Sequence, residues 1–148
     1  MLDLSLHILD IIENAVRARA RNINIAILKE NSNDRLSISI IDDGEGMDKE
    51  MLKKSMDPFF TTKDGKKIGL GLSLFAQAAQ QAGGNFKIDS EKGRGTFIKA
   101  VFKLSHPDIK PMGDILETVA SMITAYPAVR FTYDYRDGEN NYYFDSHE

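Results

Sequence analysis

The chain of 148 residues has no cysteine, which excludes disulfides, thiolate catalysis and cysteine-ligated metals and fits a reducing cytoplasm. No apolar run is long enough for a membrane span, and the N-terminal stretch LDLSLHILDII is interrupted by Asp3 and Asp10 without a basic segment before it, unlike a signal peptide. The formal net charge is only −3, which gives no general attraction to nucleic acid or anionic lipid. We therefore expect a cytoplasmic protein that binds neither nucleic acid nor membrane.

The spacing of apolar residues predicts an α+β fold with helices on one face of a mixed, mostly antiparallel sheet. Helices are predicted for 3–20, 48–56, 72–82 and 113–126. Strands are predicted for 23–29, 35–41, 85–90, 95–104, 128–135 and 141–146. The first two strands form one hairpin and the last two form another about the turn RDGE.

The stretch DDGEGM, residues 42–47, follows the strand RLSISII and precedes a predicted helix. Gly44 and Gly46 allow a sharp turn and a close approach of a flat ligand, while Asp42 is placed to accept a hydrogen bond from a ligand amino group. The alternative interpretation is a turn in which Asp48 caps the following helix. The acidic residues do not have the spacing of a calcium-binding EF-hand loop.

A polar stripe on the first predicted helix contains Asp10, Asn14, Arg17 and Arg21 at spacings of three and four. Either this stripe is a solvated helix face, or it faces a site. Further along, the basic segment DPFFTTKDGKKIGLGLSL leads into a helix N-terminus, which suits phosphate. It is neither a Walker loop nor a dinucleotide fingerprint, because GK[ST] and the third small residue are both absent.

The order of these motifs resembles the GHKL superfamily, whose ATP-binding fold is shared by DNA gyrase, heat-shock 90 chaperones, histidine kinases and MutL. ENAVRA resembles the N box, DDGEG the first glycine box, DPFFTTK the phenylalanine box, GLGLSL the second glycine box and GRGTF the terminal box. The resemblance implies a two-layer sandwich of the Bergerat type. It covers residues 1–105, with 106–148 as a helix and hairpin extension packed on the same domain.

The resemblance implies ATP and Mg²⁺ as cofactors. Asp42 would accept a hydrogen bond from the adenine amino group, and Thr96 would help to fix the same edge. The resemblance also places three further residues on the adenine side of the predicted cofactor site: Gly44, Gly46 and Met47.

On the phosphate side, Asn14 would present its carbonyl oxygen to Mg²⁺ and Arg17 would reach the phosphates. Main-chain N–H groups or the lid would contribute further contacts from Lys63, Gly69, Gly71 and Leu72. Asp10 occupies the position of the family's catalytic glutamate, one turn before Asn14, and is the candidate base.

The resemblance implies a stand-alone protein kinase, like the anti-sigma factor serine kinases, or a regulatory ATPase acting on an unknown protein partner or phosphoacceptor. We expect no self-phosphorylation of the histidine kinase kind, because His7, His106 and His147 lie in no matching motif and no helix pair precedes the N box. The alternative is a non-catalytic module that reports ATP or ADP to a partner, such as a redox enzyme. An ATP-driven dimerising clamp ranks third, because no transducer domain follows; the oligomeric state stays open.

The superfamily tends to have a strand ahead of the N box, and this sequence lacks one. We hypothesise that the C-terminal hairpin fills that edge of the sheet or docks near it.

Overall fold

The computed structural model describes residues 3–57, 70–109 and 111–148. The helices of this part are α1 (Leu4–Arg17), α2 (Lys49–Ser55), α3 (Leu70–Gln81) and α4 (Ile115–Ala125). Its strands are β1 (Asn22–Glu30), β2 (Arg35–Asp42), β3 (Asn85–Glu91), β4 (Gly95–Lys103), β5 (Arg130–Arg136) and β6 (Asn141–Asp145). The predicted alternation of helices and strand pairs is confirmed.

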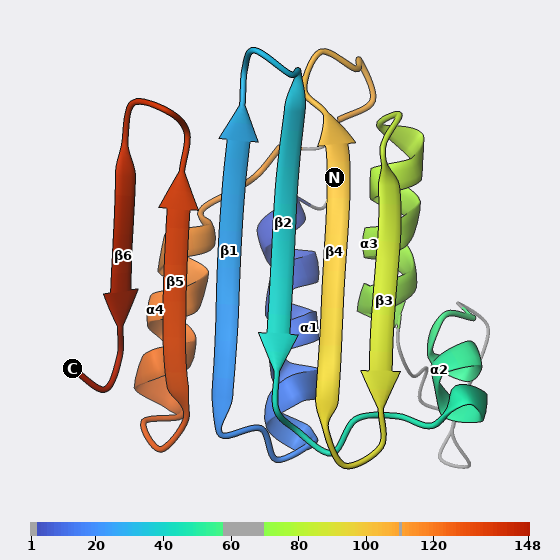
Figure 1. Cartoon of the computed structure of the whole chain (residues 1–148), viewed down its shortest axis with the longest axis vertical. Helices are drawn as coiled ribbons and strands as arrows, with labels where there is room; N and C mark the ends of the chain where they lie inside the picture. The colour runs from blue at the N-terminus through green and yellow to red at the C-terminus, as the bar shows by residue number, and fades with distance from the viewer. Residues whose placement is uncertain (1–2, 58–69, 110) are drawn as a thin grey trace.

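All six strands form one open sheet in the order β3-β4-β2-β1-β5-β6. Neighbouring strands are antiparallel except β1 and β5, which are parallel. Helices α1, α3 and α4 cover one face of the sheet, and α2 lies beside β3 at one end (Figure 1). The predicted α+β sandwich with a mixed, mostly antiparallel sheet is therefore confirmed.

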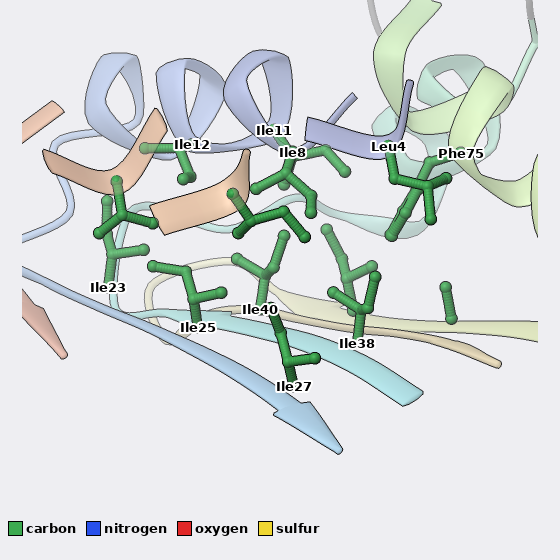
Figure 2. Packing of buried hydrophobic residues seen from close by; sticks show 14 of the residues in the cluster. Leu4, Ile8, Ile11, Ile12, Ile23, Ile25, Ile27, Ile38, Ile40 and Phe75 are labelled. Atoms are coloured by element: carbon green, nitrogen blue, oxygen red, sulfur yellow. The ribbon is translucent and has the colours of Figure 1, made fainter. Parts of the chain in front are cut away.

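The core lies between the sheet and the helix layer. The apolar stripe of α1, including Leu4, Ile8 and Ile12, is fully buried and faces isoleucines of β1 and β2 (Figure 2). In β2 the side chains alternate as predicted, so that Ile38 and Ile40 face the helices. This alternation brings Asp42, the last residue of β2, onto the helix side, where the core ends.

The ends of three helices follow capping rules. The carboxylates of Asp3, Asp48 and Asp114 each accept a main-chain N–H of the first turn, which satisfies a donor that has no partner within the helix. The predicted bounds of the helices and strands agree with the structure to within two residues except at the end of α1. Helix α1 ends at Arg17 rather than near residue 20, because Arg19 has a φ of 64°; α3 begins at Leu70, two residues early.

The C-terminal hairpin extends the sheet beyond β1. Strand β5 pairs with β1 along its whole length, from Asn22 opposite Arg130 to Leu28 opposite Arg136. The Nδ2 of Asn24 donates a 2.6 Å hydrogen bond to the Oγ1 of Thr132 across this pair. The C-terminal hairpin therefore fills the edge of the sheet beside β1. None of the helices described for residues 3–57, 70–109 and 111–148 has the length and hydropathy of a membrane span.

Candidate functional site

A cavity of about 240 Å³ opens where β2 and β4 meet the helix layer. Its walls come from α1, the loop after β2, α2, the first turn of α3 and the start of β4. Most of the lining side chains are apolar, and the polar ones come from different elements. The cavity is lined by Ile11, Asn14, Ala15, Ala18, Asp42, Gly46, Met47, Met51, Ser55, Leu72, Thr96 and Ile98.

Asp42 is the acidic side chain in this wall. Its main chain pairs with Thr96 of β4, and its Oδ1 accepts the N–H of Gly44 at 2.8 Å. Burial raises the pKa of Asp42, against the lowering effect of the N–H groups of Gly44 and Thr96. A half-buried carboxylate in an apolar cavity strongly favours a ligand that brings a hydrogen-bond donor.

The neighbouring Asp43 holds the loop from outside the cavity, a role that the sequence analysis missed. It accepts the main-chain N–H groups of Arg21 and Asn22 at 2.8 and 2.9 Å and the side-chain amide of Asn22 at 2.8 Å. Partial burial acts to raise the pKa of Asp43, but these bonds outweigh burial and lower it. Its ionised carboxylate therefore ties the end of β2 to the start of β1.

The two predicted glycines keep this loop close to its surroundings. Gly44 is buried against the C-terminal end of α1, where a Cβ would lie 2.9 Å from the carbonyl oxygen of Ala18. Gly46 has a φ of +67°, and a Cβ there would lie 2.0 Å from the carbonyl oxygen of Glu91. Gly46 and Met47 line the cavity, whereas Gly44 is not part of the wall. The capped turn and the ligand site, which were alternatives for DDGEGM, are compatible, since Asp48 caps α2 while Asp42 faces the cavity.

Helix α1 brings only part of its polar stripe to the cavity. Asn14 lines the cavity, and its Oδ1 accepts a 3.0 Å hydrogen bond from the Nη2 of Arg17, which is itself outside the wall. Asp10 is also outside the wall. Its carboxylate lies against Gly71 so closely that a Cβ on Gly71 would be 2.0 Å from the Oδ2 of Asp10. Asp10 therefore lies at the first turn of α3.

Of the predicted phosphate-side residues on the second glycine box, Leu72 lines the cavity and is 5% exposed. Gly71 is buried against α1. The two other residues predicted for this side lie outside the described residues: Lys63 and Gly69.

Ser90 is the second residue that the sequence analysis missed. Its hydroxyl lies 2.8 Å from the Oγ1 of Thr96 and accepts the N–H of Met47 at 2.8 Å. The alternation of NFKIDS contained the signal, because Ser90 shares the helix-facing side of β3 with Phe86 and Ile88. Met51 and Ser55 of α2 were missed as well, because α2 was predicted only as a helix.

The described residues contain no group of three or more histidine, aspartate or glutamate side chains able to hold a metal ion. Asn14 contributes a single amide oxygen at the cavity wall. Mg²⁺ needs few protein ligands when phosphate oxygens supply the others. The side chains present therefore fit a metal that arrives with a phosphorylated ligand better than a resident ion.

A family profile described as histidine kinase-, DNA gyrase B-, and HSP90-like ATPase matches residues 2–106. The chain belongs to this ATPase family. The resemblance inferred from the five motifs is confirmed, and the match ends shortly after β4, so that α4, β5 and β6 lie outside it.

Within the histidine kinase-like ATPases, relatives include sensor kinases. Sporulation kinase C of Bacillus subtilis is 33% identical over 65% of this chain and 22% of its own length. Sensor histidine kinase ZraS of Salmonella typhimurium is 36% identical over 72% of this chain and 22% of its own length. The chain thus spans about a fifth of each of these kinases.

Solved structures share the fold at low identity. The Aquifex aeolicus MutL ATPase domain complexed with ADP superposes with a TM-score of 0.59 at 16% identity, over 90% of this chain and 60% of that one. The N-terminal domain of a DNA repair protein superposes with a TM-score of 0.67 at 13% identity, over 97% of this chain and 52% of that one. Both likenesses extend beyond the profile match and confirm the fold.

Proposed function

We propose that this histidine kinase-like ATPase domain binds ATP in the cavity beside Asp42 and acts with it on a partner protein. The observation that carries the proposal is the half-buried Asp42 carboxylate in an otherwise mostly apolar wall. An adenine ring suits this combination, because its faces are apolar and its amino group donates hydrogen bonds. The MutL ATPase domain that shares the fold is complexed with ADP, which supports a nucleotide as the ligand.

The phosphates would extend from the cavity toward α1 and the first turn of α3. Arg17 is a cation on this side, and the N-terminus of a helix such as α3 favours an anion. Asn14 would offer its Oδ1 to Mg²⁺, which when bound would neutralise part of the phosphate charge. That oxygen now accepts a hydrogen bond from Arg17, and we propose that Arg17 exchanges this partner for a phosphate oxygen when the nucleotide and its metal bind.

For catalysis we propose protein phosphorylation with Asp10 as the general base. The hydroxyl of the acceptor protein attacks the γ-phosphorus, the bond from that phosphorus to the β,γ-bridging oxygen breaks, and the hydroxyl proton passes to the carboxylate of Asp10. Support comes from the position of Asp10 one turn before Asn14 and against the first turn of α3. The relatives named as kinases support phosphotransfer as the reaction class.

A second candidate is a non-catalytic module whose partner affinity depends on the bound nucleotide. One observation favours it: Asp10 is outside the cavity wall and is packed against Gly71. Such a module requires a partner that binds the ATP and ADP forms differently. Equal affinity of a captured partner for both forms would contradict this candidate.

Calorimetric titration with Mg·ATP tests the binding site. Asp42→Asn should weaken ATP by about 1.5–3 kcal/mol, because a charged hydrogen-bond acceptor is lost. Asp108→Asn is the matched control, since this exposed carboxylate follows β4 at the opposite end of the sheet (Figure 1). Unchanged binding by Asp42→Asn would overturn the assignment of the cavity.

Capture of a partner by the ATP-loaded chain, followed by transfer of radiolabelled phosphate, tests the kinase. Asp10→Asn should keep ATP affinity and lose transfer to the captured protein. Unchanged transfer would remove Asp10 from the mechanism, and absence of any transfer by the wild-type chain would leave the nucleotide-dependent module as the function.

A further inference from the structure

The hydroxyl of Ser90 is the meeting point of three segments around the cavity. It accepts the N–H of Met47, from the loop that leads to α2, at 2.8 Å. It lies 3.2 Å from the carbonyl oxygen of Gly95 and 2.8 Å from the Oγ1 of Thr96, both at the start of β4. Ser90 is not itself in the cavity wall, but Thr96 and Met47 are.

A serine hydroxyl has one proton and two lone pairs. The Met47 N–H uses one lone pair, which leaves one proton and one lone pair for two neighbours. The carbonyl oxygen of Gly95 can only accept, whereas the hydroxyl of Thr96 can accept or donate. Two arrangements are therefore possible, and they exclude each other because Ser90 has a single proton.

In the first arrangement Ser90 donates to Gly95 and accepts from Thr96, so Thr96 presents only lone pairs to the cavity. In the second, Ser90 donates to Thr96, and the proton of Thr96 is released toward the cavity. The first makes Thr96 a hydrogen-bond acceptor next to the Asp42 carboxylate, which is also an acceptor. The second makes Thr96 a donor beside that acceptor.

We propose that Ser90 is a positioning residue for base recognition: when the base binds, its proton turns from the carbonyl oxygen of Gly95, which accepts it at 3.2 Å in this structure, to the closer hydroxyl of Thr96, so that Thr96 offers a donor to the ligand next to the Asp42 acceptor. The proposal rests on ATP being the ligand. The adenine edge has the complementary order, an amino donor followed by the N1 acceptor. Ser90 thus favours a base that has an acceptor beside its amino group, without contacting the base.

The matched probes are ATP and 1-deaza-ATP, which retains the amino group but replaces N1 with a C–H. The wild-type chain should bind ATP about fivefold or more tightly than 1-deaza-ATP, the value of one hydrogen bond. Ser90→Ala should reduce this ratio to about two or less, mainly by weakening ATP. Ser39→Ala is the control, since Ser39 is on the face of the sheet that points away from the helices, and its ratio should equal that of the wild type.

Thr96→Val gives a second route to the same conclusion. It removes the hydroxyl that Ser90 orients and should reduce the ratio as Ser90→Ala does, and the double variant should lower it no further. A structural role for Ser90, such as anchoring Met47, would instead weaken both nucleotides by the same factor and leave the ratio unchanged.

The outcomes separate the two proposals. If the wild-type chain binds ATP but Ser90→Ala leaves the ratio unchanged, the role of Ser90 is overturned and ATP binding stands. If the wild-type chain binds ATP and 1-deaza-ATP with nearly equal affinity, the proposed role of Ser90 is overturned without any variant. If the wild-type chain binds neither nucleotide, both the ATP site and the role of Ser90 fall.

Discussion

The Nη2 of Arg17 donates a 3.0 Å hydrogen bond to the Oδ1 of Asn14, so the proposed phosphate ligand and the proposed metal ligand are partners on the same face of α1. A bound Mg·ATP would replace this bond by two stronger ones, from Arg17 to phosphate and from Asn14 to the metal. If the proposed function holds, we expect the side chains of this pair to change partners when nucleotide binds.

Arg17→Ala should weaken ATP by about 1.5–3 kcal/mol and leave adenosine binding unchanged, because only ATP has phosphates for the guanidinium to reach. Competition titrations with both ligands measure the difference. Arg35→Ala, at the far end of β2, is the control and should affect neither ligand. Equal loss of ATP and adenosine would assign Arg17 a structural role instead.

The raised pKa of Asp42 predicts that ionisation of this carboxyl group lowers the stability of the folded protein. The folded protein holds this proton more tightly than the unfolded chain, so stability falls as pH rises from 3.8 through the raised pKa. Asp42→Asn removes the effect, and its melting temperature should exceed that of the wild type at pH 7. The difference should narrow toward pH 4. A lower melting temperature for Asp42→Asn at pH 7 would contradict this prediction.

Gly71→Ala should destabilise the protein although alanine is the better helix former. In an unconstrained helix the change would stabilise by about 1 kcal/mol. Here the new Cβ would overlap the Asp10 carboxylate, at 2.0 Å from Oδ2 and 2.6 Å from Cγ, and overpacking costs about 1–3 kcal/mol. Urea unfolding measures whether Gly71→Ala raises or lowers the free energy of unfolding. The loss of stability should be smaller when Asp10 is also replaced by alanine. A net gain in stability would show that α1 and α3 are not in close contact at this point.

For Asp145 we expect the stability of the folded protein to depend on pH in the opposite direction to that expected for Asp42. Its buried carboxylate accepts from Arg130, at 2.8 Å from the Nε and also from the Nη2. The bond from Arg130 lowers the pKa of Asp145, with a further contribution from the N–H of His147. The ionised Asp145 carboxylate therefore stabilises the folded protein fully above pH 3.8, its ordinary pKa, and this stabilisation is lost as the pH falls through the lowered pKa.

Asp145→Asn should therefore lower the melting temperature at pH 7, and the wild-type advantage should disappear in strong acid. Thermal unfolding between pH 7 and pH 2 tests this, with Asp108→Asn as the exposed control. A constant difference across that range would show that the charge of Asp145 is not the stabilising feature.

The sequence predicted best what depends on local pattern. Asp42 was located because a period of two led into a turn with two glycines, and Asp48 because a capping residue precedes a helix. Ser90 and Asp43 were missed because their partners come from other strands and loops. The sequence analysis placed the C-terminal hairpin at or near a sheet edge only because the family tends to have a strand ahead of the N box. It did not predict the parallel pairing of β5 with β1, since nothing in the hairpin itself specifies its neighbour.

That parallel pairing sets an order of events for folding. Asn24 and Thr132, which join β1 to β5, are 108 positions apart, whereas β1 and β2 are joined by a short turn. Closing so long a segment costs chain entropy before any contact forms. On the ribosome, the strands and α1 that form the cavity emerge well before β5. We therefore expect the proposed nucleotide site to take shape before the sheet is complete, with an exposed β1 edge until β5 has been synthesised.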